Sequence, residues 1–377
     1  MVQAELTATV PAGTPAVPAA GRRHRGRGRG RFALLIGALT IGLWLSLTFA
    51  VTVGPVAIPL TRVWSVIGHH VLPGVFGDDR VTRPQDEIVW QLRVPRVLLG
   101  ALVGAGLAVV GAGLQALVRN PLADPYVFGM TPGATVGATI VIVSGASALG
   151  TYSLSLAAFI GAIVAFVIVL GLARSRGSLS PIRLILAGVA VSYTMGAISS
   201  AILYLGANNT ADTGAAAQVM FWQLGGLAGA TWSQVLLPGL AVLLGTTLLL
   251  LHARQLNALL VGEETATTLG VDLTRFRRRV FTLSALMTGV IVAVSGGIGF
   301  VGLMLPHAVR ILVGPDHRRV LPACVLLGAI YLVWADVLAR TVAAPEEIPI
   351  GIVTALFGAP VFLAILRARH RVGGVRE

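Results

Sequence analysis

Long uncharged, apolar blocks follow one another along most of the chain. A bilayer core of about 30 Å is crossed by roughly 20 helical residues, so a block of that length predicts one membrane-spanning helix. The block at 213–251 is too long for one crossing, and its glycine-rich LGGLAGA at 224–230 predicts a short or re-entrant helix before a full span. The blocks lie at 32–53, 97–118, 126–152, 154–173, 184–209, 213–251, 280–304, 320–335, and 341–344 continued at 348–366.

The stretch 280–315 decides the number of crossings. If it crossed once, the arginines at 318–319 and those of the tail at 367–376 would lie on opposite sides of the membrane. Positively charged residues gather on the cytoplasmic side, which favours two crossings with a turn at SGGIG (295–299). The sequence therefore predicts an all-α membrane protein of about ten transmembrane helices, with glycine-rich packing and both termini in the cytoplasm.

Charge is distributed unevenly over this topology. All 28 basic residues are arginine, and 22 of them fall on the cytoplasmic side. The remaining arginines fall outside, against the usual rule, and they need a reason of their own. They are Arg62, Arg80, Arg83, Arg93, Arg96 and Arg340.

The first 31 residues differ from the rest. Residues 1–20 are rich in Ala, Pro and Thr, and 21–31 read GRRHRGRGRGR. This composition cannot bury a core, so we expect a disordered cytoplasmic arm. Directly before an apolar block, the run fits an orientation signal for the first helix better than a nucleic-acid site. The predicted organisation is an arm at 1–31, a helical domain at 32–370 and a cytoplasmic tail at 371–377.

Composition excludes several classes of protein. Hydrophobic residues make up 55% of the chain and charged residues 11%, against about 25% charged in soluble domains. The chain has no lysine, which excludes a P-loop ATPase. Its single cysteine, Cys324, excludes an internal disulfide. No GxSxG, HExxH or intramembrane carboxylate pair is present, so we expect no catalytic residues and no enzyme activity.

Glycine recurs at helical spacing, at Gly100/Gly104, Gly129/Gly133/Gly137 and Gly225/Gly229. Small residues let helix backbones approach closely in a bilayer, where the hydrophobic effect between helices is weak. Dense helix packing explains most of these glycines.

Two segments that the topology predicts on the cytoplasmic side contain residues typical of turns and helix ends. In RNPLADPY (119–126), Pro121 and Pro125 predict a tight helix reversal, with Asn120 and Asp124 capping freed amides. The loop 252–279 predicts two short amphipathic helices that end at Gly262 and Gly270. An apolar ridge of Leu256, Leu259 and Leu260 lies either against the helix ends of the same chain or against a soluble partner.

Histidines and one carboxylate are the candidate metal ligands. His307 follows Pro306, and a lone histidine without a second ligand is more often a packing residue. His69 and His70 lie near Asp78 and Asp79 in the sequence, but adjacent histidines point in different directions, so no metal site is expected. Asp336 and Arg340 are four residues apart and can form a helical ion pair.

Four motifs, in order, resemble the FecCD-type permeases, the membrane subunits of type II ABC importers. They are WQLRVPRVLLGALVGAGLAVVGAGLQALVRNPLADPYVFG (90–129), LLVGEETATTLGVD (259–272), GGIGFVGLMLPHAVR (296–310) and EIPIGIVTALFGAPVFLAIL (347–366). The resemblance covers roughly residues 32–370 and leaves out the arginine-rich arm. It implies ten helices, a bacterial plasma-membrane location, and a second permease subunit that is identical or a close paralogue.

The resemblance also implies partners and site residues. Two cytoplasmic ATPase subunits would carry ATP and Mg, so this chain would bind no cofactor or metal itself. An extracytoplasmic substrate-binding protein would dock on Arg93, Arg96 and Arg340. The ATPase coupling loop would include Leu259, Leu260, Gly262, Glu263, Glu264, Leu269 and Gly270.

The cargo implied by the family is a metal chelate. A ferric siderophore is the first expectation, and haem and cobalamin stay open. The alternative function of a different class is a secondary transporter or an intramembrane enzyme. Either would need ionisable side chains within the spans to relay protons, and the sequence offers only Asp336 and His307 there. The wall of the pathway holds almost no ionisable side chains and suits a pre-chelated cargo.

Overall fold

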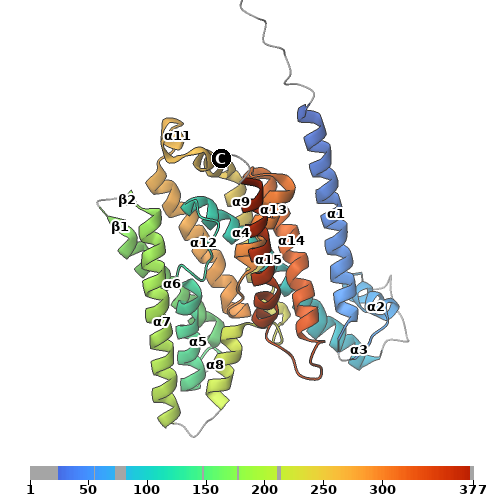
Figure 1. Cartoon of the computed structure of the whole chain (residues 1–377). Coiled ribbons are helices and arrows are strands. Elements are labelled where there is room, and N and C mark those ends of the chain that lie inside the picture. Colours follow the sequence, from blue (N-terminus) through green and yellow to red (C-terminus); the bar gives the residue numbers. More distant parts are fainter. Residues whose placement is uncertain are drawn as a thin grey trace, which may run out of the picture.

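The computed structural model describes residues 24–54, 56–72, 82–146, 148–175, 178–209 and 214–373. They form a helical bundle with one pair of two-residue strands, Arg174–Ser175 (β1) and Ser178–Leu179 (β2) (Figure 1). Within the described residues, seven helices are long and apolar enough to cross a bilayer, and three shorter apolar helices accompany them. The prediction of an all-α membrane protein is confirmed.

The long helices are α1 (His24–Thr52), α4 (Val94–Val118), α6 (Ser153–Ala173), α7 (Pro181–Asn209), α9 (Leu236–Leu251), α12 (Leu273–Ser295) and α14 (His317–Ala339). The shorter ones are α5 (Met130–Ser144), α13 (Val301–Val313) and α15 (Ile350–Gly373), of which the apolar part is Ile350–Ala364.

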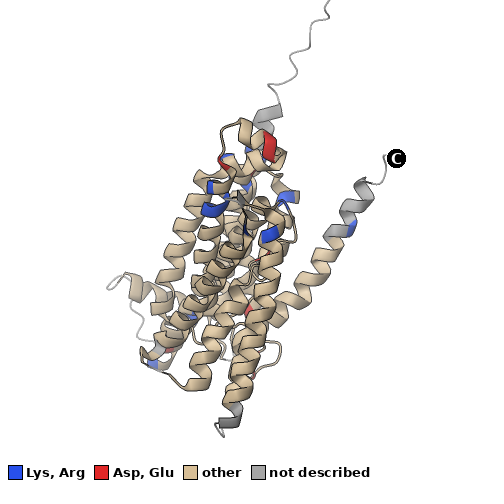
Figure 2. Ribbon diagram, turned by 90° about the vertical axis from the view of Figure 1, so that its left-hand side faces the viewer, with Lys and Arg blue, Asp and Glu red and all other residues tan. Residues whose placement is uncertain are grey.

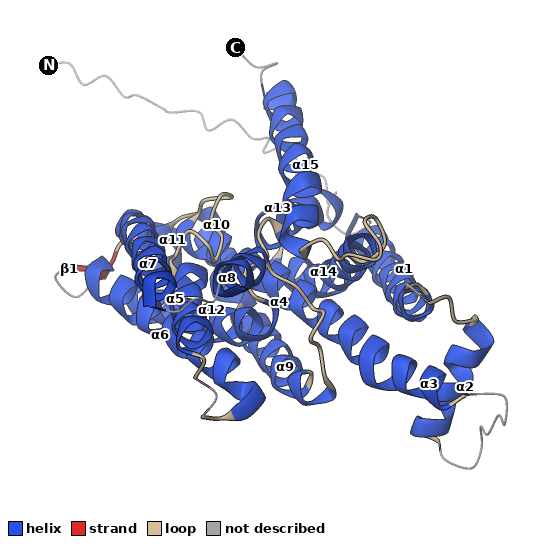
Figure 3. Ribbon diagram, turned by 90° about the horizontal axis from the view of Figure 1, so that it is seen from below, coloured by secondary structure: helices blue, strands red, loops and turns tan. Residues whose placement is uncertain are grey.

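The centre of the bundle is α4. It packs against α14, α12, α13 and α9, and it lies in the middle of the view in Figure 3. Its sequence is apolar on all sides, which is typical of a helix without a solvent face. Almost every residue from Val97 to Val118 is buried.

Glycines set the distances between these helices. A Cβ on Gly104 would collide with the carbonyl oxygen of Gly328 on α14. A Cβ on Gly133 of α5 would lie 2.5 Å from the carbonyl oxygen of Gly161 on α6. Small residues at these crossings bring the backbones into direct contact. Gly229, which the spacing also marked, instead has open space around it.

A proline in α13 explains a buried polar contact with α4. Pro306 has no N–H group, so the carbonyl of Gly302, four residues earlier, loses its helical donor. The Gln115 side chain donates from Nε2 to the carbonyl oxygens of Gly302 (3.2 Å) and Leu303 (3.1 Å). Arg310 in turn donates to Gln115 Oε1 at 2.5 Å. The side chain of one helix therefore replaces the hydrogen bond that the other lacks.

The two ambiguous apolar blocks are interrupted as predicted. The block at 213–251 forms the short helix α8 (Gly214–Leu224), a loop with a 3-10 turn at Trp232–Gln234 (η3), and then α9. The block at 280–304 breaks at 296–300 between α12 and α13. After this break the chain returns through α13 to α10 (Ala253–Val261), where Asn257 donates to Asp316, so the reversal that the charge rule required is present.

Short helices that the sequence did not predict lie near the C-terminal end of α1. They are α2 (Leu60–Val71), α3 (Arg83–Glu87) and a π-helical turn, η1 (Ile88–Arg93). Aromatic rings join them to the bundle: Trp64 stacks on Trp44 with 5.8 Å between centroids, and Trp90 lies 4.7 Å from Trp232.

Helix α1 begins earlier than the apolar pattern indicated. Residues 1–23 of the predicted arm lie outside the described residues, but the helix starts at His24 and not after residue 31. The helix runs without a break from the Gly-Arg repeat into the apolar block. At the other end α15 continues to Gly373, and residues 374–377 of the predicted tail lie outside the described residues.

Arginines gather at one end of the bundle (Figure 2). This end also carries the short helices α10 (Ala253–Val261) and α11 (Glu263–Thr268). We call it the arginine-rich end, and the charge rule places it in the cytoplasm.

Candidate functional site

Three interrupted helices meet in the bundle. The end of α8, the end of α12 and the start of α15 form a junction of residues 222–226, 295–299 and 349–351. The N–H of Gly226 donates to the carbonyl of Ser295 at 2.9 Å, and the N–H of Ile350 donates to the carbonyl of Gly225 at 3.0 Å. Irregular backbone at membrane depth persists where it is buried in protein or lines a cavity.

Two cavities border this junction. One, of about 760 Å³, is lined by Trp222, Gln218 and Gln234, and by Arg96 and Glu347. The other, of about 370 Å³, is lined by Asp124, Tyr126, Gln223 and Phe300 together with Gly297, Gly299 and Gly351. The junction therefore separates two spaces whose walls are mostly apolar with a few polar groups, a composition suited to an organic ligand.

The helix reversal between α4 and α5 forms part of the second cavity. It lies deeper in the bundle than the cytoplasmic end that the sequence predicted, because the hydroxyl of Ser192, about three turns into α7, donates to the carbonyl of Tyr126 at 3.2 Å. Arg119 ends α4 in the left-handed conformation (φ 53°). Asn120 Oδ1 then accepts a hydrogen bond from the N–H of Leu122, and Asp124 Oδ1 accepts one from the N–H of Tyr126, both at 2.9 Å.

The three arginines predicted as a docking site lie together in a buried charge cluster. Arg96 donates to Asp336 from Nη2 (2.8 Å) and to Glu347 from Nη1 (2.8 Å). The predicted ion pair of Asp336 with Arg340 is present, with 3.4 Å between Arg340 Nε and Asp336 Oδ2. We call Arg93, Arg96, Asp336, Arg340 and Glu347 the charge cluster.

Arg93 and Arg340 hold the end of α1. Arg340 donates to the carbonyl oxygens of Ala50 (2.7 Å) and Val53 (2.9 Å). Arg93 donates to those of Val51 and Thr52, both at 3.0 Å. The last carbonyls of a helix lack intrahelical donors and carry its negative partial charge, so two guanidinium groups satisfy them. Arg93 is 6% exposed and Arg340 3% exposed, so their present contacts are internal.

At the arginine-rich end, α10 and α11 form the two short helices that the sequence predicted. Gly262 (φ 150°) separates them and Gly270 (φ 83°) follows α11. Leu256 and Leu259 are buried against the bundle. Val261 and Leu269 are 72% and 69% exposed, and Leu260 is partly exposed. Leu256 and Leu259 of the predicted ridge therefore lie against their own chain, whereas Leu260 belongs with Val261 and Leu269 to an exposed apolar surface.

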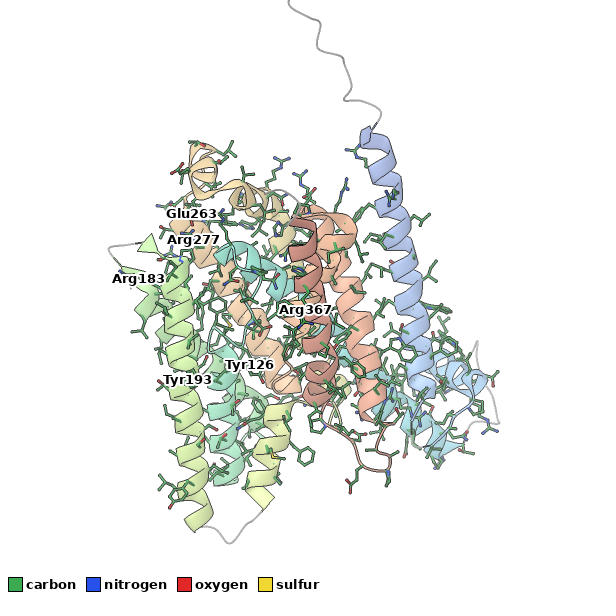
Figure 4. The ribbon with its side chains drawn as sticks, viewed as in Figure 1. Tyr126, Arg183, Tyr193, Glu263, Arg277 and Arg367 are labelled. Atoms are coloured by element: carbon green, nitrogen blue, oxygen red, sulfur yellow. The ribbon has the colours of Figure 1, made fainter. Side chains whose placement is uncertain are left out.

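A buried arginine connects this loop to a second one. Arg277, in the first turns of α12, pairs with Glu263 at the start of α11 with 2.5 Å between Nη2 and Oε1. Its Nη1 donates to the carbonyl of Leu179 in β2 at 3.0 Å. The β1–β2 hairpin leads into α7 two residues later. Arg277 thus joins α11 and α12 to β2, the strand that precedes α7. Figure 4 shows Arg277 beside Glu263.

The sequence matches the FecCD transport family over residues 42–368. The chain belongs to this family. It is 44% identical over 283 residues to the cobalamin import system permease BtuC of Halobacterium salinarum, covering 75% of this chain and 74% of that protein. It is 42% identical over 292 residues to the hemin transport system permease HmuU of Yersinia pestis, covering 76% of this chain and 85% of that protein.

Two further similarities span more of the chain. The iron(3+)-hydroxamate import system permease FhuB of Bacillus subtilis is 37% identical over 345 residues, which cover 91% of this chain and 85% of that protein. A solved structure of a metal-chelate type ABC transporter in an inward-facing conformation superposes with a TM-score of 0.76 at 31% identity, covering 89% of this chain and 99% of that one.

Membership of the FecCD family fixes the general function. The chain is the permease of a type II ABC importer for an iron chelate, haem or cobalamin. It is a multi-pass plasma-membrane subunit and not an enzyme, and it works with ATPase and permease partners. The resemblance expected from the four sequence motifs is confirmed.

Two histidines that the sequence singled out, His70 and His307, have aromatic neighbours in the structure. His70 pairs with Asp86 (3.1 Å) and stacks on Trp90 at 4.3 Å, while Asp78 and Asp79 lie outside the described residues. His307 is buried edge-on to Phe362. In the part of the chain that the structure describes, no three His, Cys, Asp or Glu side chains lie close enough together to hold a metal ion.

Sequence reasoning missed the linking role of Arg277. It stands in a run, RFRRR, whose other arginines are exposed. Its helical neighbours Phe276, Val280 and Phe281 are buried, so the 3.6-residue period marked it as lying on the buried face of α12. The glycines of the junction were visible in the sequence, but the segment that each one contacts was not.

The junction of the permease is sensitive to one methyl group. A Cβ on Gly351 would collide with the carbonyl oxygen of Leu224, so Gly351→Ala should push α15 away from α8 at a cost of about 1–3 kcal/mol. We expect a lower melting temperature in detergent and a transport rate reduced about tenfold or more. Gly226→Ala, at a junction glycine with open space around it, is the matched control. Equal behaviour of the two variants would contradict a close-packed junction.

Proposed function

We propose that this permease imports a ferric siderophore. The observation that carries the proposal is the similarity to the iron(3+)-hydroxamate permease, which extends over 91% of the chain. The mixed apolar and amide lining of the two junction cavities suits a large organic shell around the metal. Cobalamin is the second candidate, because the relative that is 44% identical is a cobalamin permease.

Uptake by cells distinguishes these cargoes. In a strain that lacks the chain, loss of labelled ferric hydroxamate uptake with normal cobalamin uptake would support the siderophore proposal. The variant Gly351→Ala expressed in that strain should fail to restore uptake, whereas Gly226→Ala should restore it. Loss of cobalamin uptake alone would contradict the proposal.

The ATPase subunits are proposed to dock on α10 and α11. The apolar side chains of Val261, Leu269 and Leu260 are exposed. Helix α11 lies at one end of the bundle (Figure 1), and neither α10 nor α11 belongs to the membrane-spanning helices. Such a surface is typical of a protein interface. ATP and Mg would bind to those subunits and not to this chain. Arg277 would carry movement of α11 to α12 and to the hairpin before α7.

The second permease subunit is proposed to pack beside α15. This helix leaves the bundle toward its C-terminus (Figures 2 and 3) and contacts mainly α13 and α14. Leu356 is 68% exposed, and Phe357 and Leu363 are more than half exposed. A second copy of the same chain could cover these side chains across a twofold axis.

The substrate-binding protein is proposed to dock at the outer end, around Arg96 and Glu347. These are the members of the charge cluster nearest the surface, since Glu347 is 36% exposed. Arg93 and Arg340 would support this surface from beneath through α1 and would not contact the partner.

A further inference from the structure

A groove opens between two helices at the arginine-rich end. It lies between the last turn of α9 and the first turns of α12 and has a volume of about 420 Å³. Its walls are apolar, with Leu248 and Leu286 each more than 40% exposed and Leu283 half-buried. Both helices are long and apolar enough to cross a bilayer, so an apolar groove between them suits an acyl chain.

The mouth of the groove is basic. His252, Arg278 and Arg279 line it beside the leucines. His252 and Arg279 also line a neighbouring hollow of about 450 Å³, which adds Arg254 and Arg275. The apolar groove and the basic hollow are therefore neighbours that share the side chains of His252 and Arg279.

The positive charge of this mouth is largely unbalanced. Arg275 forms an ion pair with Asp272 (3.1 Å). Arg254, Arg278 and Arg279 form no ion pair with the acidic side chains of the described residues, and all three are exposed. Exposed guanidinium groups without an acidic partner attract phosphate oxygens, with which they form short charge-assisted hydrogen bonds.

We propose that this groove binds an anionic phospholipid of the cytoplasmic leaflet. One acyl chain lies along Leu248, Leu283 and Leu286, and the phosphate lies at Arg278 and Arg279. The hollow beside His252 takes the rest of the headgroup, close to Arg254. Basic pockets between transmembrane helices on the cytoplasmic side are suited to such headgroups.

The combination of features favours a lipid over a soluble anion or a protein segment. A free phosphate would use the arginines and leave the leucine groove empty. A protein partner on the cytoplasmic side would reach Arg254 and Arg275 but not Leu286. That residue lies about 3.6 turns along α12 from its first residue, Leu273, toward the middle of the span. An anionic phospholipid fits both the apolar groove, with its acyl chain, and the arginines, with its phosphate.

Thermal unfolding of the full chain in detergent tests the site. Added phosphatidylglycerol should raise the melting temperature by several degrees, because a ligand that binds the folded state stabilises it. Phosphatidylcholine, which has no net charge, should give a small shift or none. Glycerol phosphate, the soluble headgroup, should also give none.

Substitutions test whether the rise in melting temperature depends on this groove. The double variant Arg278→Ala/Arg279→Ala should lose most of the phosphatidylglycerol shift, and Leu286→Trp, which fills the groove and keeps the charges, should weaken it. The matched control Arg183→Ala/Arg318→Ala removes two exposed arginines from the same end and should retain the shift. Equal shifts with both lipids, a shift with glycerol phosphate alone, or a full shift in Arg278→Ala/Arg279→Ala would overturn the proposal.

Discussion

Replacing Asp336 by alanine is expected to destabilise the permease by about 3–5 kcal/mol, since two buried guanidinium groups then lose their shared carboxylate. Asp336 is 2% exposed and lies between Arg96 (2.8 Å) and Arg340 (3.4 Å). Through Arg340 the loss extends to the C-terminal carbonyls of α1. Thermal unfolding in detergent measures the effect, together with the yield of folded protein.

The matched control is Glu347→Ala. Glu347 also pairs with Arg96 but is 36% exposed, so water replaces much of the lost interaction and the cost should be about 1 kcal/mol or less. If both alanine variants had the same melting temperature, the charge cluster would not stabilise the fold through Asp336.

Two further variants of the charge cluster distinguish a role in stabilising the fold from a role in docking the substrate-binding protein. Arg93→Gln should lower the melting temperature, because three carbonyl oxygens near the end of α1 lose donors. Arg96→Gln should also reduce the stimulation of ATP hydrolysis by the substrate-binding protein if that protein docks there. Measuring both properties for both variants distinguishes the two roles.

Replacing Arg277 by methionine is expected to uncouple ATP hydrolysis from transport. Methionine keeps an unbranched side chain on the buried face of α12 but cannot pair with Glu263 or donate to Leu179. We expect uptake in proteoliposomes to fall about tenfold or more, because a link between moving elements is lost. The ATPase subunits should still co-purify and hydrolyse ATP.

The exposed neighbour Arg275 provides the control. Among the described residues its ion-pair partner is Asp272, the N-cap of the same helix, and its side chain is 72% exposed. Arg275→Met should transport at nearly the wild-type rate. The charge exchange Glu263→Arg/Arg277→Glu should restore part of the coupling. Normal uptake by Arg277→Met would refute the linking role.

Much of the architecture could be predicted from the sequence. The lengths of the apolar blocks and the uneven distribution of arginines predicted the membrane-spanning helices. The glycines of LGGLAGA and SGGIG marked where two of the apolar blocks are interrupted. The loop helices followed from Gly262 and Gly270, since a glycine with positive φ ends a helix. These features depend on residues that are close together along the chain.

What the sequence could not supply was long-range pairing. Arg96 and Asp336 are 240 residues apart, and no local pattern joins them. The charge rule marked Arg93 and Arg340 as exceptions, but their buried contacts with α1 depend on how three helices pack. The start of α1 at His24 was missed for a different reason, because composition alone favoured disorder in the Gly-Arg repeat.

The most direct measurement is uptake of a ferric siderophore into proteoliposomes that contain the permease with and without its ATPase subunits. With the ATPases, the binding protein and ATP present, labelled iron should accumulate in the vesicle lumen. The permease alone should hydrolyse no ATP and accumulate no chelate, with or without a proton gradient. Gradient-driven uptake by the permease alone would contradict its assignment as an ABC importer subunit.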